Sequence, residues 1–193
     1  MAGFICGIDE AGRGPLAGPV TASAVILNSD FPVELLNDSK KLSEKKRIEL
    51  EKMIKEKAVC YAVCSVSHEI IDRINILQAS LLAMKNAFLS MKMQERTEIH
   101  ALIEKVIIDG TFIPDFGIPS LNCEALPKAD SLIPCVMAAS ILAKNERDRI
   151  MCGYAEIYPE YGYEKHKGYP TAYHRAVCKK IGPSPIQRQT FHY

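Results

Sequence analysis

The sequence predicts an α/β fold in a single domain, in which early strands are followed by mixed helices and strands. Its 193 residues suit one domain with one sizeable core. A short apolar segment and a second segment rich in β-branched residues and alanine lie within the first 27 residues, and segments with helical periodicity follow them. The chain has no internal repeat and no low-complexity segment that would suggest another architecture.

Three segments in the first third of the chain have the composition of strands. Residues 4–9 form a short apolar run that ends in a glycine-rich, turn-forming segment at residues 9–15. Residues 20–27 are β-branched and alanine-rich, and we expect a hairpin-like pairing with the first strand. Residues 58–66 form the third predicted strand.

Helices are predicted between and after these strands. Ser43 can cap a helix that runs to about Lys57, and Ser67 can cap a short helix. A longer helix is expected over residues 76–93. Its apolar positions share one face, which should pack on the core: Leu77, Leu81, Met84 and Phe88.

The second half of the chain predicts one more strand and two more helices. Residues 105–109 are mostly β-branched and should form a strand. A long helix should begin near Ser131, with Pro134 tolerated in its first turn, where N–H groups lack helical partners. A last helix is expected over residues 171–180, before a Pro-rich tail from residue 182.

Composition excludes several classes of protein. No basic, then apolar, then small-residue pattern marks a secretory leader, and the longest apolar run is shorter than the roughly 18 residues of a membrane span. The seven cysteines have no zinc-site spacing and fit buried free thiols in a reducing compartment. We therefore expect a cytoplasmic protein with no membrane association. We also expect a monomer.

Positive charge is clustered although the net charge is only +1. The segment from Lys165 to Lys180 mixes basic residues with tyrosines and histidines, which suits phosphate contact together with stacking. An earlier cluster can equally be a solvated helix face. It comprises Lys40, Lys41, Lys45, Lys46 and Arg47.

Four carboxylates stand at the ends of predicted elements. Asp9 and Glu10 end the first strand, Asp109 ends the fourth, and Asp130 precedes the long helix. Such groups are costly to bury unless paired, hydrated or metal-bound. Oxygen ligands of this kind suit Mg²⁺ or Mn²⁺, and two ions about 4 Å apart can clamp a phosphodiester. The set is therefore a candidate metal site.

Each carboxylate also has a structural interpretation. Asp130 or Ser131 could cap the helix, and Asp109 followed by glycine could form an ordinary turn. Asp9 and Glu10 would point to opposite faces of a regular strand, so both serve one site only if the chain bends there. The glycines at positions 12 and 14 permit such a bend.

The glycine-rich segment does not match the known nucleotide loops. It lacks the Gly-Lys-Ser/Thr of a P-loop, and its glycine spacing is one residue too long for the dinucleotide fingerprint. What Gly12-Arg13-Gly14 offers is close backbone approach. Its N–H and C=O groups could hydrogen-bond a sugar hydroxyl or a phosphate.

Several strings, in order along nearly the whole chain, resemble the type 2 ribonuclease H (ribonuclease HII) family. The first and last are highly specific. The strings are G-I-D-E-A-G-R-G-P-L-A-G-P-V from Gly7, D-S-K-K-L-S from Asp38, I-I-D-G from Ile107, K-A-D-S from Lys128, A-A-S-I-L-A-K from Ala138, R-D-R from Arg147 and H-K-G-Y-P-T-A-Y-H from His166.

Two places depart from the family pattern. Asn145-Glu146 stands where an apolar-then-polar pair is expected. The tail reads Q-R-Q-T-F from Gln187, where the family often has a histidine before the arginine and a serine before the phenylalanine.

The resemblance implies an RNase H-like fold, with a central mixed β-sheet flanked by helices and a helical C-terminal segment at about residues 165–193. It implies a single catalytic domain over residues 1–193, and a reaction that uses two divalent ions, Mn²⁺ or Mg²⁺. Its substrates would be RNA–DNA hybrids and DNA duplexes containing ribonucleotides. Cleavage on the 5′ side of a ribonucleotide would leave 3′-hydroxyl and 5′-phosphate ends.

The resemblance also assigns roles to individual residues. It implies that the ribose 2′-OH is read by Gly12, Arg13, Gly14 and Tyr169, and that Lys40 contacts substrate phosphate. Its metal-binding catalytic set would be Asp9, Glu10, Asp109 and Asp130.

Two other classes of function fit parts of the sequence. A glycosidase could use two carboxylates as acid and base, although the absence of tryptophan weighs mildly against a sugar cleft. A nucleic-acid-binding module with structural carboxylates would bind without cutting. Strand scission that depends on a divalent metal distinguishes the nuclease from both.

Overall fold

The computed structural model describes residues 3–37, 39, 41–94 and 102–191. Within them a five-stranded mixed sheet has the order β3-β2-β1-β4-β5. β1 pairs antiparallel with β2 and parallel with β4. The strands are β1 (Phe4–Ala11), β2 (Val20–Leu27), β3 (Ala58–Val66), β4 (Ile103–Asp109) and β5 (Cys123–Leu126).

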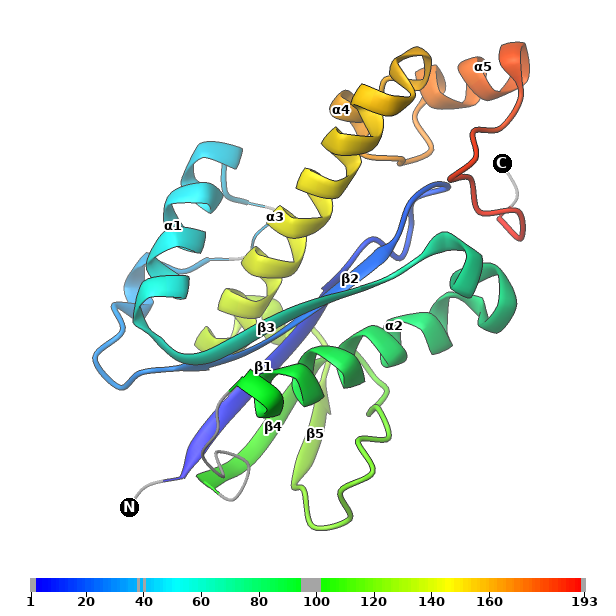
Figure 1. The fold of residues 1–193 in the computed structure, drawn as a ribbon. Helices are drawn as coiled ribbons and strands as arrows, with labels where there is room; N and C mark the ends of the chain where they lie inside the picture. Colours follow the sequence, from blue (N-terminus) through cyan, green and yellow to red (C-terminus); the bar gives the residue numbers. More distant parts are fainter. Residues whose placement is uncertain (1–2, 38, 40, 95–101, 192–193) are drawn as a thin grey trace.

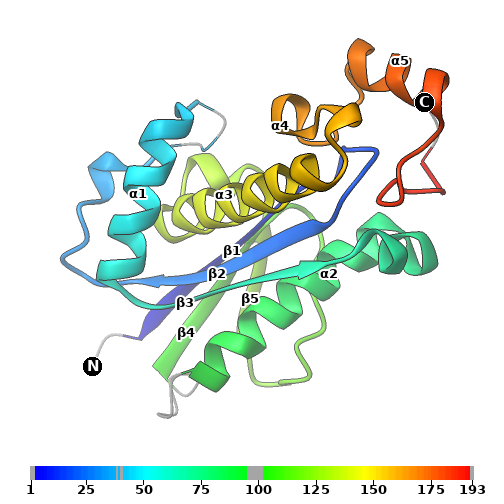
Figure 2. The ribbon, with the colours of Figure 1, turned by 45° about the horizontal axis from the view of Figure 1, so that its top comes forward.

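Helices cover both faces of this sheet, which confirms the predicted α/β layers. α2 lies on one face, and α3 lies on the other with α1 beside it (Figures 1 and 2). The last two helices stand at the C-terminal end of α3 (Figure 1). The helices are α1 (Glu44–Lys57), α2 (His68–Gln94), α3 (Pro134–Ile157), α4 (Tyr163–His166) and α5 (Ala172–Ile181), with single 3₁₀ turns at Val33–Leu35, Ala129–Ser131 and Pro159–Tyr161.

The predicted helix starts at Ser43 and Thr171 are confirmed by side-chain caps. The Ser43 hydroxyl accepts from the N–H of Lys46, and the Thr171 hydroxyl accepts from the N–H of His174. The predicted break between a short and a long helix is also present. Asn75, with φ 66° and ψ 166°, interrupts α2 just before residue 76.

The main core lies between the sheet and α2. Met84 and Phe88 are buried there and Leu81 packs against them, as predicted, whereas Leu77 is not part of this cluster among the described residues. Three fully buried alanines, Ala79, Ala83 and Ala87, lie on the same helix. Small side chains at this spacing let the helix approach the sheet closely.

Two elements differ from the prediction. The long helix begins at Pro134, three residues later than Ser131, because Ala129–Ser131 forms a separate 3₁₀ turn. The strand β5 was not predicted. It has four residues and pairs with β4 alone, so neither length nor β-branched composition marks it in the sequence.

In the described part of the chain, no helix is both long and apolar enough to cross a bilayer. All seven cysteines are free thiols, as the sequence predicted, with Cys6, Cys60, Cys135 and Cys178 buried.

Candidate active site

The pairing of β1 with β4 brings Asp9 and Asp109 together. Ile8 is the register partner of Ile108, so the next residue of each strand stands beside the other. Side chains in register on parallel strands point to the same face. This face is the one covered by α3, because Gly7 packs against the backbone of Cys135 at the start of that helix.

Asp130 completes a group of three carboxylates. One oxygen from each of Asp9, Asp109 and Asp130 lies within 4.8 Å of the other two. The N–H of Asp130 donates to Oδ1 of Asp109 over 3.3 Å, which ties the 3₁₀ turn to the end of β4. The alternative of a helix cap is wrong, since the N-cap position of α3 is held by Ile133 and no side-chain cap bond is made there.

The electrostatics of this group fit a divalent cation. The pKa of Asp9 is raised well above its ordinary value by burial and by the charges of Glu10 and Asp109, against a lowering hydrogen bond from Ser140. Crowded, desolvated carboxylates of this kind repel one another, and a cation relieves the repulsion. Hard oxygen ligands favour Mg²⁺ or Mn²⁺ over softer metals.

Glu10 lies next to this group but not within it. β1 keeps regular pairing with β2 through Glu10 to Ala11, so the backbone does not bend there, and Glu10 nevertheless lines the same pocket as Asp9. Its Oε1 lies 3.7 Å from the Arg13 guanidinium. The role of Glu10 as a fourth metal ligand stays a prediction.

A pocket of about 210 Å³ opens beside Asp9 and unites most of the predicted substrate residues. Tyr169 is 41% exposed, and a Cβ at Gly14 would lie 3.8 Å from its ring. Lys40 falls outside the described residues, and its predicted phosphate contact stays a prediction. The lining residues include Glu10, Gly12, Arg13, Gly14 and Tyr169.

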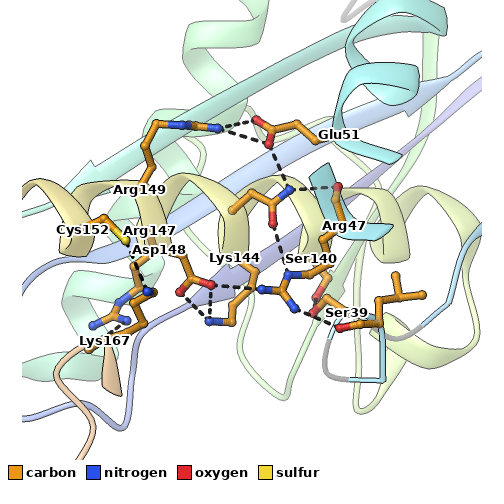
Figure 3. A network of polar contacts seen from close by, with 12 residues as sticks. Ser39, Arg47, Glu51, Ser140, Lys144, Arg147, Asp148, Arg149, Cys152 and Lys167 are labelled. Atoms are coloured by element: carbon orange, nitrogen blue, oxygen red, sulfur yellow. Dashed lines mark hydrogen bonds and ion pairs between the residues drawn. The ribbon is translucent and has the colours of Figure 1, made fainter. Parts of the chain in front are cut away.

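Three residues that sequence reasoning did not single out also line this pocket. Ser39 and Ser140 lie with their hydroxyl oxygens 2.8 Å apart, which joins the segment before α1 to α3. The Lys144 amine donates to Oδ2 of Asp148 over 2.7 Å (Figure 3). A sequence pattern could have placed two of them, because the polar residues 140, 144 and 148 repeat at the four-residue spacing of one helix face.

The departure at Asn145 has a structural reason. This side chain is buried between α1 and α3, and its amide donates to the carbonyl of Arg47 and to Oε2 of Glu51, both over 2.9 Å. Arg47 in turn bonds Asp148 over 3.2 Å, as Figure 3 shows. A polar residue at position 145 therefore holds α1 against α3, and Arg47 belongs to this network rather than to a solvated face.

The basic segment at the C-terminal end divides into exposed and engaged side chains. Lys165 and Lys179 are exposed. The amine of Lys167 instead contacts Sγ of Cys152 at 3.3 Å and the carbonyl of Glu164. Of these three lysines, Lys165 and Lys179 are therefore better placed than Lys167 to contact a duplex.

Comparison with known proteins shows the family to which this chain belongs. The Ribonuclease HII family profile matches residues 6–193. This chain belongs to that family. It is therefore an enzyme, a ribonuclease H.

Individual members of the family are similar in sequence to this chain over nearly its full length. The Ribonuclease HII of Treponema denticola is 54% identical, over 97% of this chain and 98% of its own. That of Dechloromonas aromatica is 49% identical, over 98% and 91%.

Solved structures share the fold. The RNase HII of Archaeoglobus fulgidus, solved as a complex with PCNA, matches with a TM-score of 0.76 at 28% identity, over 98% of this chain and 96% of its own. The ribonuclease H2 of Pyrococcus horikoshii matches at 0.75 and 26%, over 98% and 94%. The RNase H-like fold that the resemblance implied is confirmed.

Proposed function

We propose that this enzyme hydrolyses the RNA strand of RNA–DNA hybrids and nicks duplex DNA on the 5′ side of an embedded ribonucleotide. The products would be 3′-hydroxyl and 5′-phosphate ends. The observation that carries the proposal is the group of three aspartates, Asp9, Asp109 and Asp130, beside a pocket lined by Gly12-Arg13-Gly14 and Tyr169. A group able to hold cations thus adjoins backbone and an aromatic ring able to read a sugar.

The three aspartates, with Glu10 beside them, would hold two divalent ions, Mg²⁺ or Mn²⁺. Such ions lower the pKa of water and neutralise charge on phosphoryl oxygens. The protein's own residues position the substrate: the N–H groups of the glycine segment face the sugar, and Tyr169 packs beside it. No side chain needs to act as a nucleophile.

The geometry disfavours the glycosidase alternative. The two carboxyl groups of such enzymes stand at least about 5 Å apart so that sugar or water fits between them. Here three carboxylate oxygens lie within 4.8 Å of one another, a spacing better suited to a shared cation.

The proposal is tested with a labelled duplex that carries one ribonucleotide. We expect a single nick on its 5′ side with Mg²⁺ or Mn²⁺, and none with a chelator, because the aspartates need the cation to stabilise phosphoryl charge. An all-DNA duplex of the same sequence is the control. Scission in the presence of chelator, or equal scission of both duplexes, would contradict the proposal.

The exposed lysines should govern the salt dependence of substrate binding. If Lys165 and Lys179 each contact a phosphate, the variant with both changed to alanine should bind every duplex more weakly. Its slope of log affinity against log salt should flatten by about one unit per contact, because fewer counterions are released. Fluorescence anisotropy across a salt series measures this slope.

Lys52 supplies the matched control for this prediction. Its side chain is 80% exposed on α1 and pairs only weakly with Glu56, at 3.9 Å. Lys52→Ala should keep the wild-type slope. A wild-type slope in the Lys165 and Lys179 double variant would show that neither lysine contacts a phosphate and that both belong to the solvated surface.

A further inference from the structure

Two arginines are buried beneath the glycine segment without carboxylate partners. Arg147 of α3 is 1% exposed, and Arg188 of the C-terminal tail is 0% exposed. Neither forms an ion pair with any described residue, and each guanidinium bonds backbone carbonyls instead. A buried charge is costly, so its retention calls for a specific function of these bonds.

Together the two guanidinium groups bind most carbonyls of residues 12–19. Arg188 donates over 2.7–3.1 Å, and Arg147 over 3.0–3.2 Å. The acceptors of Arg188 are Gly12, Arg13, Pro15, Gly18 and Pro19, and those of Arg147 in this segment are Ala17 and Pro19.

These bonds fix the direction of the neighbouring N–H groups. In a trans peptide the C=O and the following N–H point in opposite directions, and the described residues contain no cis peptide bond. The carbonyls of Gly12 and Arg13 point inward to Arg188, so the N–H groups of Arg13 and Gly14 point away from it. Both residues line the pocket beside Asp9.

Each arginine is itself held in place. A Cβ at Gly12, where φ is 101°, would collide with the side chain of Arg147, so this glycine admits the guanidinium. Arg147 also donates to the carbonyl of Lys167, and its Cζ lies 5.8 Å from the ring centroid of Tyr169. One arginine thereby links both parts of the pocket that face the sugar.

Arg188 is anchored through the tail that follows it. The N–H groups of Gln189 and Thr190 and the Thr190 hydroxyl all donate to Asp72 of α2, over 2.7–3.0 Å. The threonine that departs from the family pattern therefore keeps the hydroxyl that this anchor uses.

We propose that Arg147 and Arg188 are positioning residues for sugar recognition, which orient the Arg13 and Gly14 N–H groups so that ribose is preferred over deoxyribose. The inference rests on the proposed function. Neither guanidinium touches substrate. Lysine cannot replace either one, because a single ammonium does not span carbonyls that a planar fork of five donors reaches.

The test measures KM for a duplex with one ribonucleotide, and the inhibition constant Ki of the all-DNA duplex as a competitor. The ratio Ki/KM reports sugar discrimination, and an inactive or unfolded fraction of protein does not change it. Arg188→Met and Arg147→Met should each lower this ratio by about tenfold or more, since misplaced groups in a site commonly cost up to about a hundredfold. Ki itself should stay near the wild-type value.

Arg149→Met is the matched control. Arg149 lies two residues from Arg147 on the same helix, but its guanidinium bonds Glu51 of α1 over 3.0 Å (Figure 3). Its ratio should equal that of the wild type. If a methionine variant does not fold, Arg188→Lys and Arg147→Lys decide, and both should show the same lowered ratio.

The outcomes separate the two proposals. No cleavage by the wild type, or a wild-type Ki/KM near one, would overturn the proposed function and this inference with it. A discriminating wild type whose folded Arg147 and Arg188 variants keep the full ratio would overturn the inference alone.

Discussion

Asp9→Asn and Asp109→Asn should each reduce kcat on a single-ribonucleotide duplex by at least about two orders of magnitude. The amide keeps the size of the side chain but removes a negative ligand from a group whose oxygens lie within 4.8 Å. Losses of this size are usual when a preorganised charge at a reacting centre is removed. Steady-state cleavage with Mg²⁺ and with Mn²⁺ measures kcat, and calorimetric titration of Mn²⁺ measures the accompanying loss of metal affinity.

The fold should survive these substitutions, and Asp9→Asn should raise stability in metal-free buffer. Burial, Glu10 and Asp109 raise the pKa of Asp9, so the folded protein disfavours its ionised form. As pH rises above the pKa that Asp9 has in the unfolded chain, ionisation of Asp9 lowers the free energy of unfolding. At neutral pH the neutral amide of Asp9→Asn avoids this loss of stability. Thermal melting with chelator checks this.

Asp30→Asn is the control, because Asp30 is exposed in the turn after β2. It should leave kcat, metal affinity and the melting temperature unchanged. Near-wild-type cleavage by both Asp9→Asn and Asp109→Asn would show that the aspartate group is not the catalytic metal site.

Local sequence predicted the fold well where one segment carries its own pattern. The cap at Ser43, the helix start at residue 171 and the break before residue 76 depend on neighbouring residues only, and all three are present. β5 depends instead on its pairing with β4, which its four residues do not encode. The four-residue helix α4 was also missed, because it is too short to show a helical period.

The candidate site could be predicted only in part, because its residues meet through the register of distant strands. Regular pairing of β1 continues through Glu10 without the bend that the sequence left open, yet Glu10 lines the same pocket as Asp9. That Asp109 stands beside Asp9 follows from the pairing of β1 with β4, about a hundred residues apart in sequence. The roles of Arg147 and Arg188 could not be predicted for a related reason, since a buried arginine that bonds distant backbone carbonyls leaves no pattern in the sequence.

A 2′-O-methyl group on the single ribonucleotide should abolish detectable cleavage, a loss of at least about four orders of magnitude. Sites built to hydrogen-bond a hydroxyl reject analogues without it on this scale, because the site's polar groups are then left unpaired. Methylation removes the donor of the 2′-OH and adds bulk beside Gly14, where the ring of Tyr169 already lies close. Quantitative gel analysis of both duplexes under identical metal conditions gives the ratio of rates.

The position of the methyl group supplies the control for this prediction. Two substrates carry one ribonucleotide each at the same test position, and the 2′-O-methyl group is placed either on that ribonucleotide or on an added ribonucleotide several base pairs away. Only the first placement should stop cleavage at the test position, because only that sugar would lie against Gly12-Arg13-Gly14 and Tyr169, which line one pocket beside Asp9. Equal cleavage of the methylated and unmethylated junctions would show that Gly12-Arg13-Gly14 and Tyr169 do not read the 2′-OH. The aspartate group would then cut by backbone geometry alone, and the preference for ribonucleotides would have to come from the A-form shape of the duplex.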